Sequence, residues 1–326
     1  MSTIIGVDVS KDSFDTAFEK DIKKYVQGKF DNCSEGFCLF YDSMPQGDRV
    51  IVMEATGPYY LKLAYFLHEK GEKVAVVNPL KIRRFAQMRF ERVKTDKADA
   101  RIIASYGRNE ELKLWEPLEE HIVDIRQICS VMERMVKDRT AWKNKHEALK
   151  NDPKHSLMAM REIEEMMAYI TKKLEDLENK LDKIIKDHFD DQNKIIRSIP
   201  GIGPKTAIIL LALTNGFTRF DNYKEFISYV GLSPRIYNSG TIKGKTHICK
   251  LGMSRARQLL YMAARAASKY NTACKLLYER LLEKGKAKKL ALIAVANKLV
   301  KQAFALTSKS ELYAKDFAPD LSLLVR

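Results

Sequence analysis

Ile4-Ile5-Gly6-Val7-Asp8-Val9-Ser10 is a short apolar run that carries a carboxylate near its end, and it sets the fold of the N-terminal part of the chain. Apolar, largely β-branched residues in such a run predict a buried strand. Val50-Ile51-Val52-Met53-Glu54 repeats the pattern further along the chain. Acids at the ends of such strands can converge on a point that no single segment could build.

Two further acids follow in Lys94-Thr95-Asp96-Lys97-Ala98-Asp99-Ala100-Arg101. Asp96 and Asp99 are three residues apart on a helical stretch, so both face the same way. Acids packed closely repel one another unless a cation holds them, and hard oxygen ligands suit Mg²⁺ or Mn²⁺. Divalent metals held in this way drive phosphodiester chemistry. A salt-bridge cluster, with Glu54 as a simple strand-end acid, remains the alternative.

The segments around these acids predict an α/β domain over residues 1–115. Ser34 is placed as the N-terminal cap of the first helix, Gly71 closes the second, and Asn78-Pro79 stops the last strand. The expected order of elements is that of a ribonuclease-H-like fold: three strands, a helix, a strand, a helix, a strand and a final helix. We expect strands at 4–9, 15–18, 25–30, 50–53 and 74–77, and helices at 34–44, at 59–70 and around Asp96 as far as about residue 106.

Residues 116–195 predict a helical coiled-coil region. Apolar residues recur at spacings of three and four before Pro153 and again, without interruption, after it. A seam of this kind predicts a helical hairpin or a coiled coil. We expect it to carry contacts between subunits of a dimer or tetramer, with packing inside one chain as an equal alternative. The second seam consists of Ile163, Met167, Ile170, Leu174, Leu177, Leu181 and Ile184.

Residues 196–326 predict a mainly helical domain that begins with a helix-hairpin-helix-like turn, Ser198-Ile199-Pro200-Gly201-Ile202-Gly203. Two glycines let the backbone approach a phosphate, and the next helix offers free N–H groups and the positive end of its dipole. Lys205 adds a positive charge. A tight helix turn without a ligand is the alternative. We expect the later helices at 254–270 and 286–307.

Charge is distributed very unevenly along the chain. The net charge is +15, and residues 233–301 carry 16 lysines and arginines against two acids, whereas the remainder is close to neutral. One basic segment of this kind favours a polyanionic partner such as nucleic acid, with a merely solvated basic surface as the alternative. The candidate contacts to nucleic acid are Lys205, Arg235, Lys243, Lys245, Lys250, Arg255 and Arg257.

Cysteine usage and hydropathy place the chain among cytoplasmic globular proteins. The five cysteines form no C-x-x-C pair and have no matched histidine spacing, which argues against zinc and fits a reducing compartment. Apolar runs are short and interrupted by charge, so we expect no transmembrane helix. The first residues lack the basic start and the apolar core of a signal peptide.

Six blocks occur in the order expected of the DEDD transposases of bacterial insertion sequences, the bridge-RNA-guided recombinases related to the Piv DNA invertases, and the chain resembles this family over nearly its whole length. The blocks are Gly6-Val7-Asp8-Val9-Ser10-Lys11, Met53-Glu54-Ala55-Thr56-Gly57, Lys94-Thr95-Asp96-Lys97-Ala98-Asp99-Ala100-Arg101, Ser198-Ile199-Pro200-Gly201-Ile202-Gly203, Gly231-Leu232-Ser233-Pro234-Arg235 and Asn238-Ser239-Gly240.

The resemblance implies a RuvC-like N-terminal domain, a coiled-coil middle and a C-terminal transposase domain. It implies that Asp8, Glu54, Asp96 and Asp99 form the metal-binding tetrad, with Mg²⁺ expected and Mn²⁺ as an alternative. It also implies that Ser239 is the nucleophile that becomes linked to a DNA phosphate, and that a guide RNA reads the DNA. By composition alone, Ser239 in Asn-Ser-Gly would be a turn serine, and these residues show no RNA-reading motif.

Three other functions compete with a recombinase. A RuvC-like metal-dependent nuclease would use water as its nucleophile and would leave no DNA–protein adduct. A sugar-kinase or actin-like ATPase needs a second glycine-rich phosphate loop, which the sequence does not contain. A non-catalytic nucleic-acid scaffold explains the basic segment but gives the four acids no purpose.

Overall fold

The structure is a computed structural model, and it describes residues 2–21, 24–90, 96–235, 238–239, 242–243, 247–249 and 251–314. Its contacts divide the chain into two compact units, residues 1–118 and 119–326, and each is described by itself. The predicted boundaries at residues 115 and 195 stay predictions.

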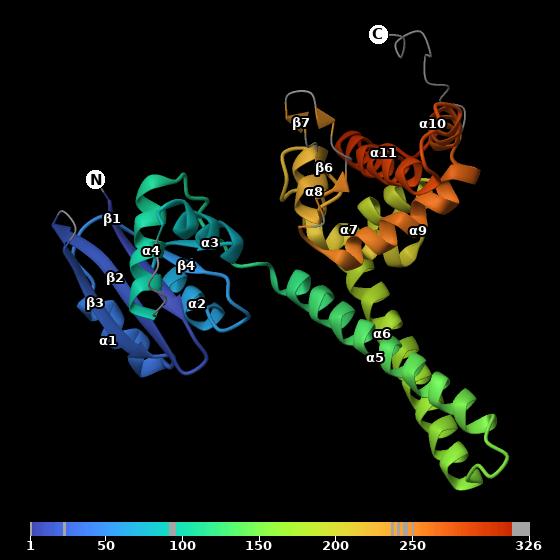
Figure 1. Ribbon diagram of the computed structural model, residues 1–326, viewed down its shortest axis with the longest axis horizontal. Helices are drawn as coiled ribbons and strands as arrows, with labels where there is room; N and C mark the ends of the chain where they lie inside the picture. The colour runs from blue at the N-terminus through green and yellow to red at the C-terminus, as the bar shows by residue number, and fades with distance from the viewer. Residues whose placement is uncertain are drawn as a thin grey trace. The chain divides into compact units, whose positions relative to one another are not determined.

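A five-stranded mixed sheet forms the centre of the first unit, with strand order β3-β2-β1-β4-β5 (Figure 1). The antiparallel part joins β1 to β2 and β2 to β3, and the parallel part joins β1 to β4 and β4 to β5. This mixed sheet was predicted and is consistent with a ribonuclease-H-like fold. The strands are β1 Thr3–Val9, β2 Ser13–Asp21, β3 Lys24–Asp31, β4 Arg49–Glu54 and β5 Lys73–Val77.

Alternation along the strands divides the buried side chains between two cores. On one face, Ile5, Val7 and Met53 pack with α1 (Ser34–Ser43) and α2 (Leu61–Glu69). On the other face, Val52 packs with α3 (Pro79–Met88) and α4 (Asp96–Asn109). The sheet is therefore covered by helices on both faces.

One local prediction for this unit was wrong, and one was incomplete. Cys33, not Ser34, is the N-cap residue of α1, and no side-chain cap bond forms there. The prediction that Asn78-Pro79 ends the last strand is confirmed, because β5 ends at Val77, but the same two residues also start α3, which had not been predicted. The Asn78 side chain accepts a hydrogen bond from the backbone nitrogen of Leu80, and Pro79 occupies the first turn, where its missing N–H costs nothing.

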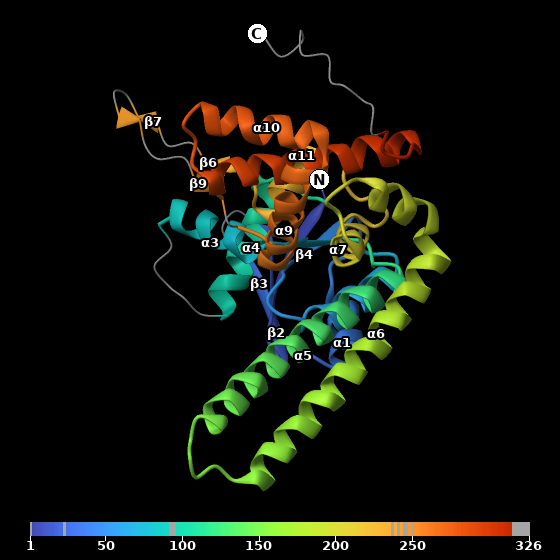
Figure 2. The same ribbon diagram turned by 90° about the vertical axis from the view of Figure 1, so that its right-hand side faces the viewer.

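Two long helices open the second unit and form an antiparallel hairpin (Figure 2). Bonds between Arg139 and Thr171 and between His146 and Glu164 connect α5 and α6 along their length. The apolar residues of the second seam that are most buried are Ile163, Ile170, Leu174 and Leu181. Because α5 lies alongside them in the same chain, the seam follows the intrachain alternative, and the oligomeric state stays a prediction. The helices are α5 Glu120–Lys150 and α6 Leu157–Ser198.

The rest of the second unit is a bundle of five helices with short two-residue strands between α8 and α9. Helix α9 has the predicted bounds, and α11 begins two residues later than predicted. Helix α7 is the helix expected after the glycine turn, whereas α8 and α10 had not been predicted. Helix α11 is long and apolar enough to span a membrane by length and composition, but its apolar residues pack against α9, α10, α6 and α8. The helices are α7 Pro204–Thr214, α8 Tyr223–Val230, α9 Ser254–Tyr270, α10 Thr272–Glu283 and α11 Lys288–Lys309.

Candidate metal centre and nucleic-acid interface

Register places two of the predicted acids side by side at one end of the sheet. In the parallel pair of β1 and β4, Gly6 lies opposite Val52 and Val7 opposite Met53, so Asp8 and Glu54 come next on the two strands. Val52 belongs to the core under α3 and α4, and Glu54 is two residues further on. Both carboxylates therefore share the face that α4 covers.

The orientation of α4 brings its own two acids toward the same end. A Cβ atom at Gly6 would collide with the backbone of Ala100 and Ala104, so helix and strand are in direct contact there. A Cβ atom at Gly107 would lie 2.8 Å from the Cγ2 atom of Ile4. Helix α4 thus runs antiparallel to β1, and its first turn, with Asp96 and Asp99, lies toward the Asp8 end.

A fifth acid, Asp15, lies on this same face and was not singled out from the sequence. It stands directly opposite Asp8 in the antiparallel pair of β1 and β2, and it is only 5% exposed. The Oδ2 atom of Asp15 lies 4.0 Å from the Nζ atom of Lys29, and the side chain of this lysine is 58% exposed. A buried acid in the middle of a strand has no local sequence signature, and only the register reveals its neighbour.

The donor set fits a hard divalent cation, because every candidate ligand is a carboxylate oxygen. Glu54 keeps one oxygen engaged with the hydroxyl of Thr56 at 2.8 Å, which orients its side chain. Within the described part of the chain, no three acidic, histidine or cysteine side chains are close enough to form a ready-made metal group. The Asp96 side chain lies outside that part, so the four-residue site stays a prediction.

The predicted nucleophile lies in a short two-stranded ribbon of the second unit. Ser239 ends β7 (Asn238–Ser239) and stands opposite Ile242 of β8 (Ile242–Lys243). Arg235 ends β6 (Pro234–Arg235), which pairs with β9 (His247–Ile248). The side chains of Ser239, Arg235 and Lys243, and the whole of Lys245 and Lys250, lie outside the described residues.

The two glycines of the turn between α6 and α7 have different surroundings. Gly201 has φ +105°, and a Cβ atom there would lie 2.6 Å from the Cβ atom of Ala267 on α9. Nothing lies within 4 Å of such an atom at Gly203, the N-cap residue of α7. Lys205 is engaged with Glu178 at 2.8 Å. Gly201 therefore serves helix packing, and only Gly203 is open to a ligand.

The two predicted contact arginines of α9 also differ. One guanidinium nitrogen of Arg257 donates to the carbonyl oxygen of Val230 at 2.8 Å, at the C-terminal end of α8. Arg255 donates to the side-chain oxygen of Gln258 in its own helix at 3.0 Å. Arg257 therefore joins α9 to α8, whereas Arg255 is the better candidate for an external phosphate.

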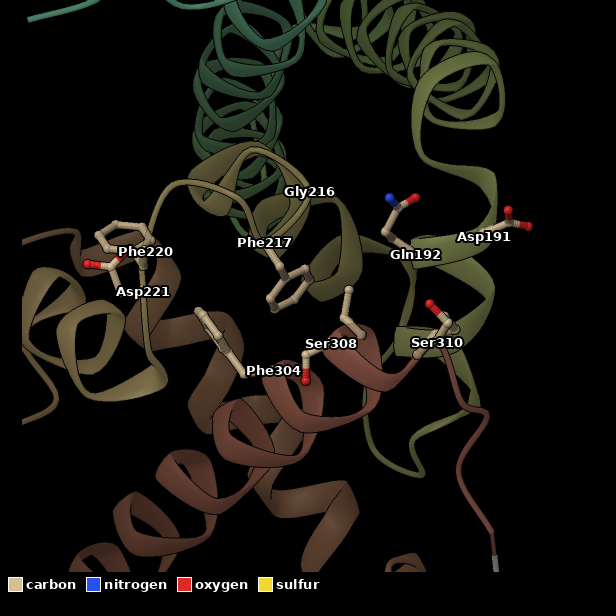
Figure 3. A pocket seen from close by; sticks show the side chains of 11 residues that line it. Asp191, Gln192, Gly216, Phe217, Phe220, Asp221, Phe304, Ser308 and Ser310 are labelled. Atoms are coloured by element: carbon tan, nitrogen blue, oxygen red, sulfur yellow. The ribbon is translucent and has the colours of Figure 1, made fainter.

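A cavity of about 350 Å³ lies between α6, α11 and the α7–α8 connection (Figure 3). Phe217 and Phe304 face one another on one side of it, and Gln192 stands on the other. Its lining includes the carboxylates of Asp191 and Asp221 and no lysine or arginine. An acidic lining without a cation opposes the binding of phosphate.

Two family profiles match the chain. The DEDD transposase profile of IS110 elements, described as a transposase, matches residues 5–152, and the profile described as the transposase IS116/IS110/IS902 family matches residues 193–279. The first covers the strands and helix that hold the five acids. The second covers the glycine turn, the ribbon with Ser239 and α9.

Three relatives match this chain over almost its whole length. The pilin gene-inverting protein of Moraxella lacunata is 29% identical over 96% of this chain and 98% of its own length. The transposase for insertion sequence element IS1111A of Coxiella burnetii is 24% identical, with 95% of this chain and 91% of its own length covered. The transposase for IS1328 of Yersinia enterocolitica is 22% identical over 96% of this chain and 99% of its own length. The chain belongs to the IS110 family of DEDD transposases, enzymes that act on DNA.

Proposed function

We propose that this transposase cuts and exchanges the DNA strands of an insertion sequence and its target through a covalent bond between Ser239 and a DNA phosphate. Asp8, Glu54, Asp96 and Asp99 hold the divalent metal that a DEDD domain implies, and Mg²⁺ is the expected ion. The metal part of the proposal is carried by the register that sets Asp8 beside Glu54 and by the contacts that direct the first turn of α4 toward them. The assignment of Ser239 rests on the family resemblance.

A bound divalent cation would supply charge neutralisation at the phosphate under attack. The chain supplies the rest. The oxygen of Ser239 bonds to phosphorus while the bond from phosphorus to a sugar oxygen breaks, and the serine proton ends on the departing sugar hydroxyl. A serine hydroxyl is a weak nucleophile, so it needs a nearby base or metal to act. Strand exchange then reverses the step with a different sugar hydroxyl.

A guide RNA and an oligomer complete the proposal. The basic segment at residues 233–301 accepts RNA as readily as DNA, and its charge supports binding of both. If base pairing with the guide reads the target, the protein need not carry the target sequence in its own contacts. Exchange between two duplexes needs several cuts, which favours a dimer or tetramer. The proposed compartment is the cytoplasm.

The covalent bond gives the decisive test. The protein is purified with its RNA, mixed with end-labelled DNA from the boundary of its own element and Mg²⁺, and run on a denaturing gel. We expect a protease-sensitive shifted band that disappears in Ser239→Ala and with EDTA. Ser228→Ala, which changes an exposed serine of α8, is the matched control and should keep the band.

A second function, hydrolytic cleavage by a RuvC-like nuclease, makes the opposite prediction. It is favoured if labelled DNA is cut without any shifted band and if Ser239→Ala cuts at the wild-type rate. Cleavage that persists unchanged in EDTA would exclude the metal role in both mechanisms.

A further inference from the structure

Arg126 of α5 holds a fixed position at the C-terminal end of α7. Its Nε and Nη2 atoms donate to the carbonyl oxygen of Ala212 at 3.1 and 3.0 Å. These bonds use two of the five N–H donors of the guanidinium group and leave three for another acceptor. The side chain is half-buried, so its charge is partly removed from water.

Arg219, on the connection between α7 and α8, brings a second positive charge to the same place. Its guanidinium carbon lies 5.5 Å from the ring centre of Phe220 and 5.1 Å from that of Tyr229 on α8. Burial lowers the pKa of Arg126, and repulsion from Arg219 lowers this pKa further. The backbone nitrogen of Arg219 donates to the carbonyl oxygen of Thr214 at 2.9 Å, so the connection that carries Arg219 folds back on the same end of α7 to which Arg126 bonds.

Arg255 adds a third positive charge on the α9 side. Burial raises the pKa of Cys129 to about 11, against the opposing effect of Arg255. The start of α9 packs directly on α8, because a Cβ atom at Gly252 would lie 2.1 Å from the carbonyl oxygen of Tyr229. The first turn of α9, with Arg255, therefore lies beside the residue whose ring Arg219 covers. The N-cap residue of α9, Met253, provides no side-chain cap, which leaves N–H groups at the helix start available to an acceptor.

In the described part of the chain, no carboxylate oxygen lies within 4.0 Å of a side-chain nitrogen of Arg126, Arg219 or Arg255. Arg126 and Arg255 are partly buried and Arg219 is exposed, and the two partly buried charges cost free energy without a counter-ion. Arginine stays protonated at any physiological pH, so it cannot avoid this cost by losing its charge. An external anion would relieve this cost.

We propose that Arg126 and Arg219, with Arg255 beside them, form a binding site for the phosphate backbone of a nucleic-acid strand. The planar forks of arginine suit two oxygens of one phosphate, and stacking on Tyr229 fixes the fork of Arg219. Two of the three residues lie outside the basic segment at 233–301, so this site extends the interface to α5 and the α7–α8 connection. The inference rests on the DNA-acting function of the family and not on the serine mechanism.

The test measures binding without cleavage. A fluorescein-labelled single-stranded DNA, its duplex and an RNA of the same sequence are titrated by anisotropy at several salt concentrations in EDTA. Arg219→Gln should lower the slope of log affinity against log salt by about 0.7 to 0.9. A similar loss with all three probes is expected, because a backbone site reads no bases. Arg126→Lys keeps its charge and should retain most of the slope.

Arg161→Gln is the matched control, because Arg161 is 81% exposed on α6 and is paired with Glu165 along the helix. Its slope should stay at the wild-type value. The inference is overturned if Arg219→Gln and Arg161→Gln give equal slopes while the wild-type protein binds the probes. Failure of the wild-type protein to bind any probe would instead contradict the DNA-acting function itself. Unchanged melting temperatures in the absence of nucleic acid confirm that the variants are folded.

Discussion

At the scale of single residues, Asp15 is the side chain whose environment most needs an explanation. Directly opposite positions in an antiparallel pair bring Cα atoms to about 4.5 to 5.5 Å, and like charges there destabilise a sheet. Asp8 and Asp15 occupy such a pair, and Asp15 is almost fully buried. An exposed lysine at 4.0 Å compensates little. A cation held at this end of the sheet would stabilise both acids.

Asp15→Asn keeps the shape of the side chain and removes its charge. We expect the metal-free protein to gain about 0.2 to 1 kcal/mol of stability, because one directly opposed pair of like charges is lost. The stabilisation by added Mg²⁺ should shrink, because the variant holds the ion less tightly, and strand cleavage should slow. Thermal melting with and without Mg²⁺ measures the first two effects.

Asp12→Asn, at an exposed acid in the turn between β1 and β2, is the control and should change neither the melting temperature nor its response to Mg²⁺. Asp15 is only a structural residue if its variant responds to Mg²⁺ as the wild-type protein does and cleaves at the same rate.

At the scale of elements, the two glycines of the turn between α6 and α7 differ in how closely they are packed. Gly201→Ala should destabilise the protein by more than about 2 kcal/mol, because the added atom meets Ala263 and Ala267 of α9 at 2.6 to 2.9 Å and the backbone has positive φ. Gly203→Ala, which meets nothing within 4 Å, should cost less than about 1 kcal/mol. Urea unfolding of both variants measures the difference, and equal losses would refute this difference in packing.

Element prediction succeeded where a local pattern determines the outcome. Strands β1, β4 and β5 follow from short apolar runs, and α9 was placed at both ends because its polar and apolar faces alternate with helical period. Helix α3 was missed because Asn78-Pro79 stops one element and starts the next. The seam of α6 shows which face is buried, but periodicity does not say whether the covering helix belongs to the same chain, and α5 covers it here.

Some residues of the candidate sites could be predicted from the sequence, and others could not. Asp8 and Glu54 stand out because an acid ends an apolar run, and register confirms that their strands are neighbours. Asp15 is visible only through its partner across the sheet, so no local pattern marks it. Arg126 and Arg219 lie on α5 and on the α7–α8 connection, which are far apart in sequence and meet only in the fold. A count of charges along the sequence therefore singled out residues 233–301 and not these two arginines.

At the scale of the whole molecule, the acids and the serine belong to different compact units. Asp8 and Glu54 lie within residues 1–118, and Ser239 lies within 119–326. In the proposed mechanism, Ser239 and the metal must reach the same phosphate, since a reacting pair has to approach to about 3 Å. Either the two units of one chain meet over the DNA, or the serine of one subunit completes the metal site of another.

We expect the shared arrangement, in which a mixture of Ser239→Ala and Asp8→Ala proteins regains cleavage although each variant alone has none. In a twofold dimer, a mixed pair restores one of its two centres, because the intact serine of one subunit meets the intact acids of the other. Free exchange of equal amounts would restore about a quarter of the centres. A mixture of Ser239→Ala with the Ser239→Ala, Asp8→Ala double variant contains no serine nucleophile and is the matched control. If the first mixture stays as inactive as this control after subunits have exchanged, each active centre is built within one chain.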